Sequence, residues 1–147
     1  MADVPRVVLD TNVCLDLLLF GDPRAAALHA ALRAGTVIAM TDEHCRAEWL
    51  RVLAYPQLGL PELAQQDMSK RHDEITASFL HGEAEADTSE ATPLPRCADP
   101  DDQKFLVLAH ACGARWLISR DNLLLKLASR TRREGWFDIV TPEAWAP

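Results

Sequence analysis

The sequence predicts an α/β fold, a three-layer sandwich in which helices cover both faces of a mainly parallel central sheet. Two observations predict it. Short β-branched runs alternate along the chain with longer segments whose apolar residues recur at helical spacing. Strands joined through helices pair in parallel, because each helix returns the chain to the same end of the sheet. The chain has 147 residues and no linker or internal repeat, so we expect one domain over residues 1–147.

The first elements follow from clear start and stop signals. Arg6–Leu9 is a β-branched run that predicts a buried strand, and the polar residues Asp10-Thr11-Asn12 follow it. Residues 13–20 are rich in leucine and favour a short helix, which Gly21-Asp22-Pro23 ends. The same proline opens a second helix, which we expect to end near Gly35.

A second strand is followed by a third helix. Residues 36–40 (TVIAM) have the length and composition of a buried parallel strand. Thr41-Asp42-Glu43 supplies a cap and first-turn acids for a helix over about residues 44–54. On this helix Glu48 lies roughly 60° from Cys45, at the edge of the apolar stripe. Its carboxylate is therefore expected to face into the fold.

The rest of the chain continues the alternation. Residues 61–80 predict one or two helices, residues 82–95 an acidic loop, and residues 94–98 a short strand. Asp99-Pro100-Asp101-Asp102 carries the start signals of a helix that Gly113 ends. A strand, a helix, a strand and a short helical start complete the chain, at residues 116–119, 122–127, 137–141 and 142–143.

Charge and hydropathy exclude some classes of protein. Lysine and arginine total 15 and aspartate and glutamate 22, so the net charge of −7 argues against binding nucleic acid through bulk charge. The N-terminus lacks the pattern of a secretory signal, and the longest apolar run, Phe105–Ala109, is too short to span a bilayer. We therefore expect a cytoplasmic protein with no membrane partner. Its four cysteines form no paired motif and predict reduced, buried thiols, with zinc ligation as the second option.

Four acids are expected to meet at one edge of the sheet. Asp10 and Asp121 end two strands, Asp102 opens the helix before the second of these strands, and Glu48 faces inward. Ligands bind at the carboxyl ends of strands in open parallel sheets. Clustered carboxylates repel one another unless a hard divalent cation is present, and oxygen-only ligation suits Mg²⁺ or Mn²⁺. Such a cation supports metal-dependent hydrolysis of a phosphodiester.

The same acids have a structural interpretation. With 22 acids in the chain, some fall at strand ends by chance, and Asp99 and Asp102 also suit helix caps. Spacing alone leaves the two interpretations evenly matched.

Several segments together resemble the PIN domain. They occur in the family's order between Val7 and Trp145, and they are VVLDTNV (7–13), RAEWLRVL (46–53), DPDDQKFL (99–106), GARWLISRD (113–121) and Leu123-Leu124. Within that family they are similar to a bacterial subgroup described as toxin components of toxin–antitoxin systems. PIN domains are Mg²⁺- or Mn²⁺-dependent ribonucleases, so the resemblance implies an endoribonuclease that cleaves RNA.

The resemblance also implies roles for individual residues. The catalytic carboxylates are Asp10, Glu48, Asp102 and Asp121, and the metal ligands are Asp10, Asp102 and Asp121. Asn12 and Ser119 orient ligands or a phosphate beside them. A toxin implies an antitoxin protein as partner, and the helices over residues 61–80 offer a surface for it or for a homodimer, although an ordinary amphipathic pair has the same pattern.

The chain departs from the family's pattern in two places. Asp99, Asp101 and Asp102 compete for one acidic position, which Asp102 matches best and Asp99 next. Arg120 stands where small residues are commoner, and it either adds affinity for phosphate or is incidental.

Two other classes of function remain as alternatives. A phosphatase of the haloacid-dehalogenase type also carries an aspartate after its first strand, but it needs a second acid where this chain has Asn12. A catalytically silent PIN-like module that binds RNA or protein is the second alternative. The intact set of acids argues against it, because degenerate members of the family usually lose carboxylates.

Overall fold

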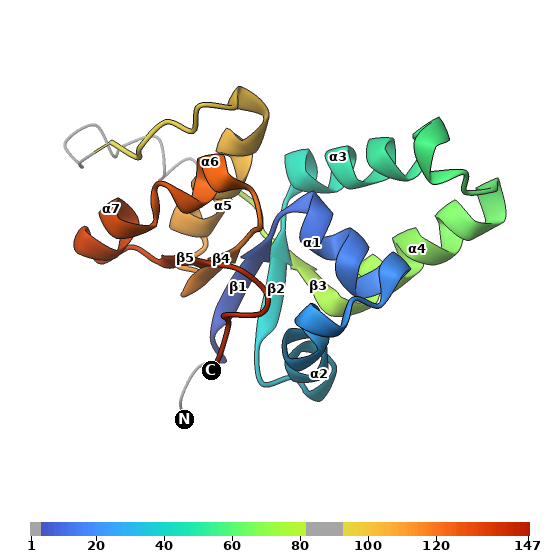
Figure 1. The fold of residues 1–147 in the computed structure, drawn as a ribbon, viewed down its shortest axis with the longest axis horizontal. Helices are drawn as coiled ribbons and strands as arrows, with labels where there is room; N and C mark the ends of the chain where they lie inside the picture. The colour runs from blue at the N-terminus through green and yellow to red at the C-terminus, as the bar shows by residue number, and fades with distance from the viewer. Residues whose placement is uncertain (1–3, 82–92) are drawn as a thin grey trace.

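The structure is a computed structural model that describes residues 4–81 and 93–147. In these residues a five-stranded sheet with the order β3-β2-β1-β4-β5 forms the centre, and every neighbouring pair is parallel (Figure 1). The strands are β1 (Arg6–Leu9), β2 (Ile38–Thr41), β3 (Thr76–Ser78), β4 (Trp116–Ile118) and β5 (Asp138–Val140).

The helices surround this sheet. They are α1 (Thr11–Leu15), α2 (Ala26–Ala34), α3 (Glu43–Leu53), α4 (Glu62–Ile75), α5 (Gln103–Ala111), α6 (Asn122–Leu125) and α7 (Ala128–Arg133). In the described ranges, 3-10 turns adjoin them at Pro23–Ala25, Pro56–Leu58 and Pro100–Asp102, and a π-helical turn at Asp16–Phe20. None of the helices in the described ranges is both long and apolar enough to cross a membrane.

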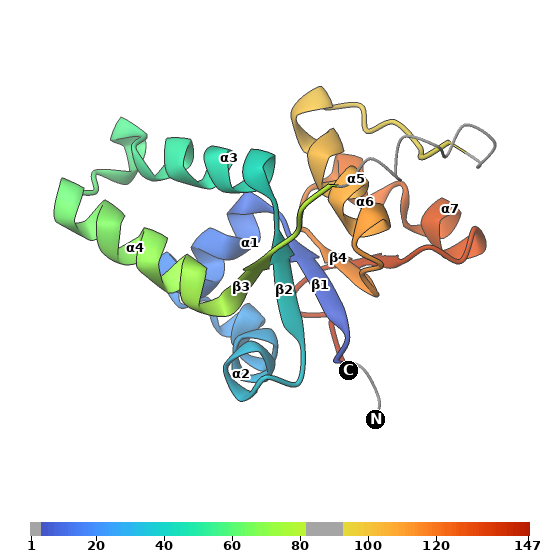
Figure 2. The ribbon, with the colours of Figure 1, turned by 180° about the vertical axis from the view of Figure 1, so that it is seen from behind.

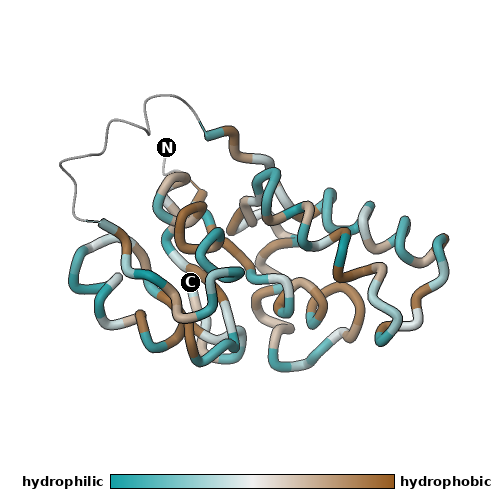
Figure 3. The backbone as a smooth tube through the Cα atoms, turned by 90° about the horizontal axis from the view of Figure 1, so that it is seen from above, coloured by the Kyte–Doolittle hydropathy of each residue, from teal (hydrophilic) through white to brown (hydrophobic). Residues whose placement is uncertain are grey.

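Helices lie on both faces of the sheet, which confirms the three-layer α/β fold. Figures 1 and 2 show α1 to α4 on one side and α5 to α7 on the other. Side chains alternate along a strand, so Val7 packs in one core with Trp49 while Val8 packs in the other with Phe105. Along the helices the hydropathy alternates between hydrophilic and hydrophobic, as expected for amphipathic helices that cover a core (Figure 3).

The central position of β1 determines where the site forms. Val8 pairs with Met40 of β2 on one side and with Leu117 of β4 on the other. The ladder continues past the strand ends, since the backbone N–H of Asp10 donates to the carbonyl of Ile118 at 3.1 Å. The polar residues after β1 therefore lie beside those after β4.

Two expectations about strands were wrong. Residues 76–78 were expected to be helical, but α4 ends at Ile75 and they form β3, which pairs with β2 from Ala39 onward. Residues 94–98 form no strand. The side chain of Gln103 holds that segment instead, because it accepts from the N–H of Cys97 and donates to the carbonyl of Pro95. The acidic loop expected at 82–95 falls largely outside the described residues.

Smaller differences concern the helices. The helix expected over residues 13–20 is the short α1 followed by the π-helical turn. The helix after β4 is divided into α6 and α7, and residues 142–144 form a turn rather than a helix. The expected buried thiols are confirmed, since Cys14, Cys45, Cys97 and Cys112 are all free and buried.

Candidate metal and catalytic site

The carboxyl ends of β1 and β4 bring two acids together. Asp10 caps α1 by accepting from the N–H of Val13 at 2.9 Å, and Asp121 caps α6 by accepting from the N–H of Leu123 at 2.8 Å. Ser119 joins them, because its hydroxyl donates to Asp10 Oδ2 and accepts from the backbone N–H of Asp121 at 2.9 Å. Both aspartates thus have fixed positions at adjacent strand ends.

An open pocket of about 180 Å³ lies beside these strand ends. Its acidic lining residues are Asp10, Glu48, Asp99, Asp101, Asp102 and Asp121. Thr11, Asn12, Val52 and Phe105 complete the wall. All four carboxylates expected from the sequence therefore reach one pocket, from β1, α3, the turn before α5, and β4.

Three of the acids approach more closely than the rest. Carboxylate oxygens of Asp99, Asp102 and Asp121 lie within 4.8 Å of one another. Asp102 Oδ2 is buried and has no hydrogen-bond partner among the described residues. Burial, together with the neighbouring Asp121 carboxylate, raises the pKa of Asp102 to about 7. Oxygen donors, a high density of negative charge and an unsatisfied oxygen are what a hard divalent cation requires, so these residues fit Mg²⁺ or Mn²⁺.

Asp10 lies at the buried end of the pocket. Only 4% of its surface is exposed, and burial raises its pKa to about 6 against the lowering effect of the Ser119 hydrogen bond. The Asp121 carboxylate raises it further. Asp10 is outside the group of three acids within 4.8 Å of one another, but Ser119 joins it to Asp121, and its charge contributes to the raised pKa of Asp102.

Glu48 is held by two donors. Its Oε2 accepts from the Thr11 hydroxyl, and its Oε1 pairs with Lys104 Nζ at 2.7 Å. Lys104 also donates to the carbonyl of Asp101. Nothing in the spacing between Glu48 and Lys104, 56 residues apart, indicated that they would pair.

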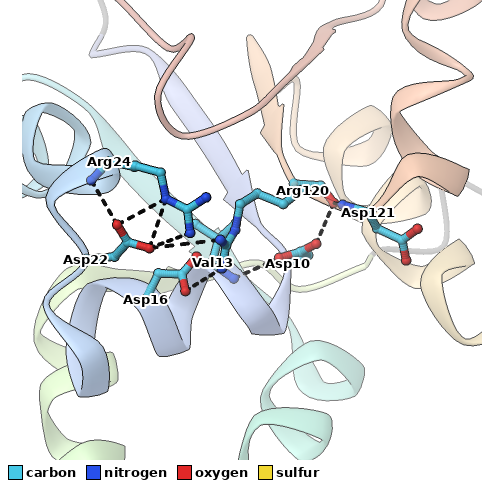
Figure 4. Close-up of polar contacts among 8 residues, drawn as sticks. Asp10, Val13, Asp16, Asp22, Arg24, Arg120 and Asp121 are labelled. Atoms are coloured by element: carbon cyan, nitrogen blue, oxygen red, sulfur yellow. Dashed lines mark hydrogen bonds and ion pairs between the residues drawn. The ribbon is translucent and has the colours of Figure 1, made fainter.

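Arg120 points away from the acidic group. Its Nη2 pairs with Asp16 at 2.5 Å and its Nη1 lies 3.9 Å from Asp22, which in turn pairs with Arg24 (Figure 4). The loop after β4 is therefore tied to the π-helical turn after α1. Asn12 is exposed and lies on the wall of the acidic pocket.

In a parallel α/β sandwich, ligands bind at the carboxyl ends of the strands, which is where the acidic pocket of this chain lies. A family model described as the PIN domain matches residues 6–123, so the chain belongs to the PIN domain family, whose members are generally nucleases. No curated protein matches the sequence.

Solved structures with this fold include one toxin–antitoxin complex. It is the crystal structure of VapBC2 from Rickettsia felis bound to a DNA fragment from their promoter. The aligned chain has 11% sequence identity and a TM-score of 0.59, and the alignment covers 92% of this chain and 98% of that one.

Proposed function

We propose that the protein is a Mg²⁺- or Mn²⁺-dependent endoribonuclease and the toxin of a toxin–antitoxin pair, acting in the cytoplasm. The observation that carries the proposal is the pocket at the ends of β1 and β4. Three carboxylates there approach within 4.8 Å, and one buried oxygen has no hydrogen-bond partner in the described part of the chain. Such a group of acids is unfavourable by itself and becomes favourable with a divalent cation. Membership of the PIN domain family supports the same chemistry.

In this proposal each acid has its own task. Asp10, Asp102 and Asp121 are the proposed cation ligands, and Asp99 lies close enough to Asp102 and Asp121 to contribute a further oxygen. A bound Mg²⁺ or Mn²⁺ supplies Lewis acidity toward phosphate oxygens and a nucleophilic water at neutral pH. Ser119 keeps Asp10 and Asp121 at a fixed separation through its two hydrogen bonds.

The Glu48–Lys104 pair has a separate task. Lys104 offsets the charge of Glu48, and the Thr11 hydroxyl fixes the orientation of the Glu48 carboxylate. Glu48 is thereby positioned at the pocket wall as an acceptor for a water or a substrate hydroxyl. This role requires that its carboxylate lie within hydrogen-bond reach of that group.

The proposed partner is an antitoxin that presents a basic side chain to the pocket. Arginine matches paired carboxylates through two parallel hydrogen bonds, so an arginine-bearing tail would compete with the cation and with RNA. The fold neighbour comes from a complex named VapBC2, which supports a search for a small partner protein.

Calorimetry with Mn²⁺ tests the cation site without a known substrate. We expect the wild type to bind Mn²⁺, Asp102→Asn and Asp121→Asn to lose most of the binding, and Asp67→Asn, which changes an exposed acid on α4, to bind as the wild type does. RNA cleavage in Mn²⁺ should then disappear in Asp10→Asn. Absence of Mn²⁺ binding by the wild type, or cleavage that persists in EDTA, would refute the proposal and favour a silent binding module.

A further inference from the structure

A second pocket opens beside the acidic one. It has a volume of about 330 Å³. Its lining residues are Asn12, Leu15, Asp16, Phe20, Arg120 and Asp121. Asn12 and Asp121 also line the acidic pocket, so the two pockets adjoin each other. A polymer bound at the carboxylates would extend directly into this second pocket.

Phe20 is the aromatic residue of the second pocket. It is 60% exposed and belongs to neither of the two cores in the described residues, although Leu17 and Leu18 of the same π-helical turn are buried. The turn ends at Gly21, which has a positive φ of 57°. π-Helical insertions often occur at functional sites, and this exposed ring offers a surface for a flat ligand.

Arg120 contributes a second flat surface. Its guanidinium edge is held by Asp16, whose side chain is 6% exposed, while Asp22 lies 3.9 Å from Nη1 (Figure 4). These two carboxylates offset the positive charge of Arg120, so this arginine is poorly suited to bind a phosphate. Asp16 fixes the guanidinium through Nη2, while Nε has no hydrogen-bond partner among the described residues and the side chain stays 30% exposed. The planar face of an arginine can stack on a nucleobase.

We propose that this second pocket binds one unpaired nucleobase of single-stranded RNA, next to the phosphodiester at the carboxylates, with Phe20 and Arg120 as stacking surfaces. The inference rests on the proposed function and specifies how the same site holds its substrate. Stacking accepts every base, and the Asn12 amide can donate and accept at the base edge. A base inside a duplex is already stacked and paired, so the pocket selects single strands.

Binding of a fluorescein-labelled single-stranded RNA, followed by anisotropy in Ca²⁺, tests the pocket. Phe20→Ala should weaken binding about tenfold, whereas Phe20→Trp should retain it. Arg120→Lys keeps the charge but loses the planar face, so it should also weaken binding. Leu63→Ala, which removes a 78% exposed side chain on α4, is the control and should bind as the wild type does.

A series of RNAs with one abasic position moved along the strand locates the stacked base. At one position the missing base should weaken binding by the wild type about as much as Phe20→Ala does, and it should have no further effect on that variant. If Phe20→Ala binds every RNA as the wild type does, the inference is wrong.

Cleavage assays in Mn²⁺ separate this inference from the proposed function. A wild type that cleaves RNA, alongside a Phe20→Ala variant with unchanged KM, refutes only the stacking pocket. A wild type that binds no RNA and cleaves none refutes both. A raised KM with unchanged kcat in Phe20→Ala supports the pocket, because the ring then contributes to binding and not to chemistry.

Discussion

Replacing Asp10 with asparagine is expected to stabilise the metal-free protein at neutral pH. Burial raises the folded-state pKa of Asp10 from 3.8 to about 6, so the folded protein binds a proton more tightly than the unfolded chain does. The contribution of Asp10 to the free energy of unfolding is therefore lost as the pH rises from 3.8 to about 6. The shift corresponds to about 3 kcal/mol above pH 6, at about 1.4 kcal/mol per unit. Asparagine avoids this loss and still accepts from the N–H of Val13.

Urea denaturation in EDTA at pH 5 and pH 8 measures the effect. The free energy of unfolding of Asp10→Asn should exceed that of the wild type by up to about 3 kcal/mol at pH 8, and the difference should shrink at pH 5. Asp67→Asn, at an exposed ion pair, should change stability by less than about 0.5 kcal/mol at either pH. An Asp10→Asn variant less stable than the wild type at pH 8 would refute the reasoning that burial of this charge is unfavourable.

Three further predictions concern the core and the acidic pocket. Burial lowers the pKa of His72 to about 4, so the wild type should lose up to about 3 kcal/mol as pH falls from 6.5 to 4, and His72→Phe should lose less in the same denaturation series. Phe105→Ala should cost about 3–5 kcal/mol in urea denaturation, because Phe105 is 2% exposed and truncation of a buried ring leaves a cavity in the core. Lys104→Met removes the counter-charge of Glu48 and should lower the melting temperature in EDTA, with partial recovery in Mn²⁺; Lys70→Met, at an exposed position, should change neither value.

The order of strands and helices was largely predictable because short local sequence patterns, apolar runs followed by helix caps, specify most of the elements that form the core. The apolar runs at residues 7–9 and Trp116–Ile118 have no polar interruption. Soon after each run comes an aspartate, Asp10 or Asp121, that caps the next helix. The parallel arrangement follows from the helices between them. It also explains why the acids expected from the sequence line one pocket.

The misplaced elements depended on contacts distant in sequence. β3 has the sequence Thr-Ala-Ser, which lacks an apolar run, and only pairing with β2 makes it a strand. Residues 94–98 were expected to form a strand, but the side chain of Gln103 instead bonds the N–H of Cys97 and the carbonyl of Pro95. Likewise the close approach of Asp99 to Asp102 and Asp121 depends on the 3-10 turn Pro100–Asp102, whose geometry spacing alone does not specify.

The edge strands of the sheet, β3 and β5, are short, and this limits self-association through the sheet. Each has three residues, so each edge offers few free backbone groups to a strand from another molecule. Extension of the sheet from copy to copy is therefore disfavoured, which protects the protein from edge-to-edge aggregation. A homodimer of this chain would have to use its helical surfaces, and residues that alter it should be sought there rather than on the sheet.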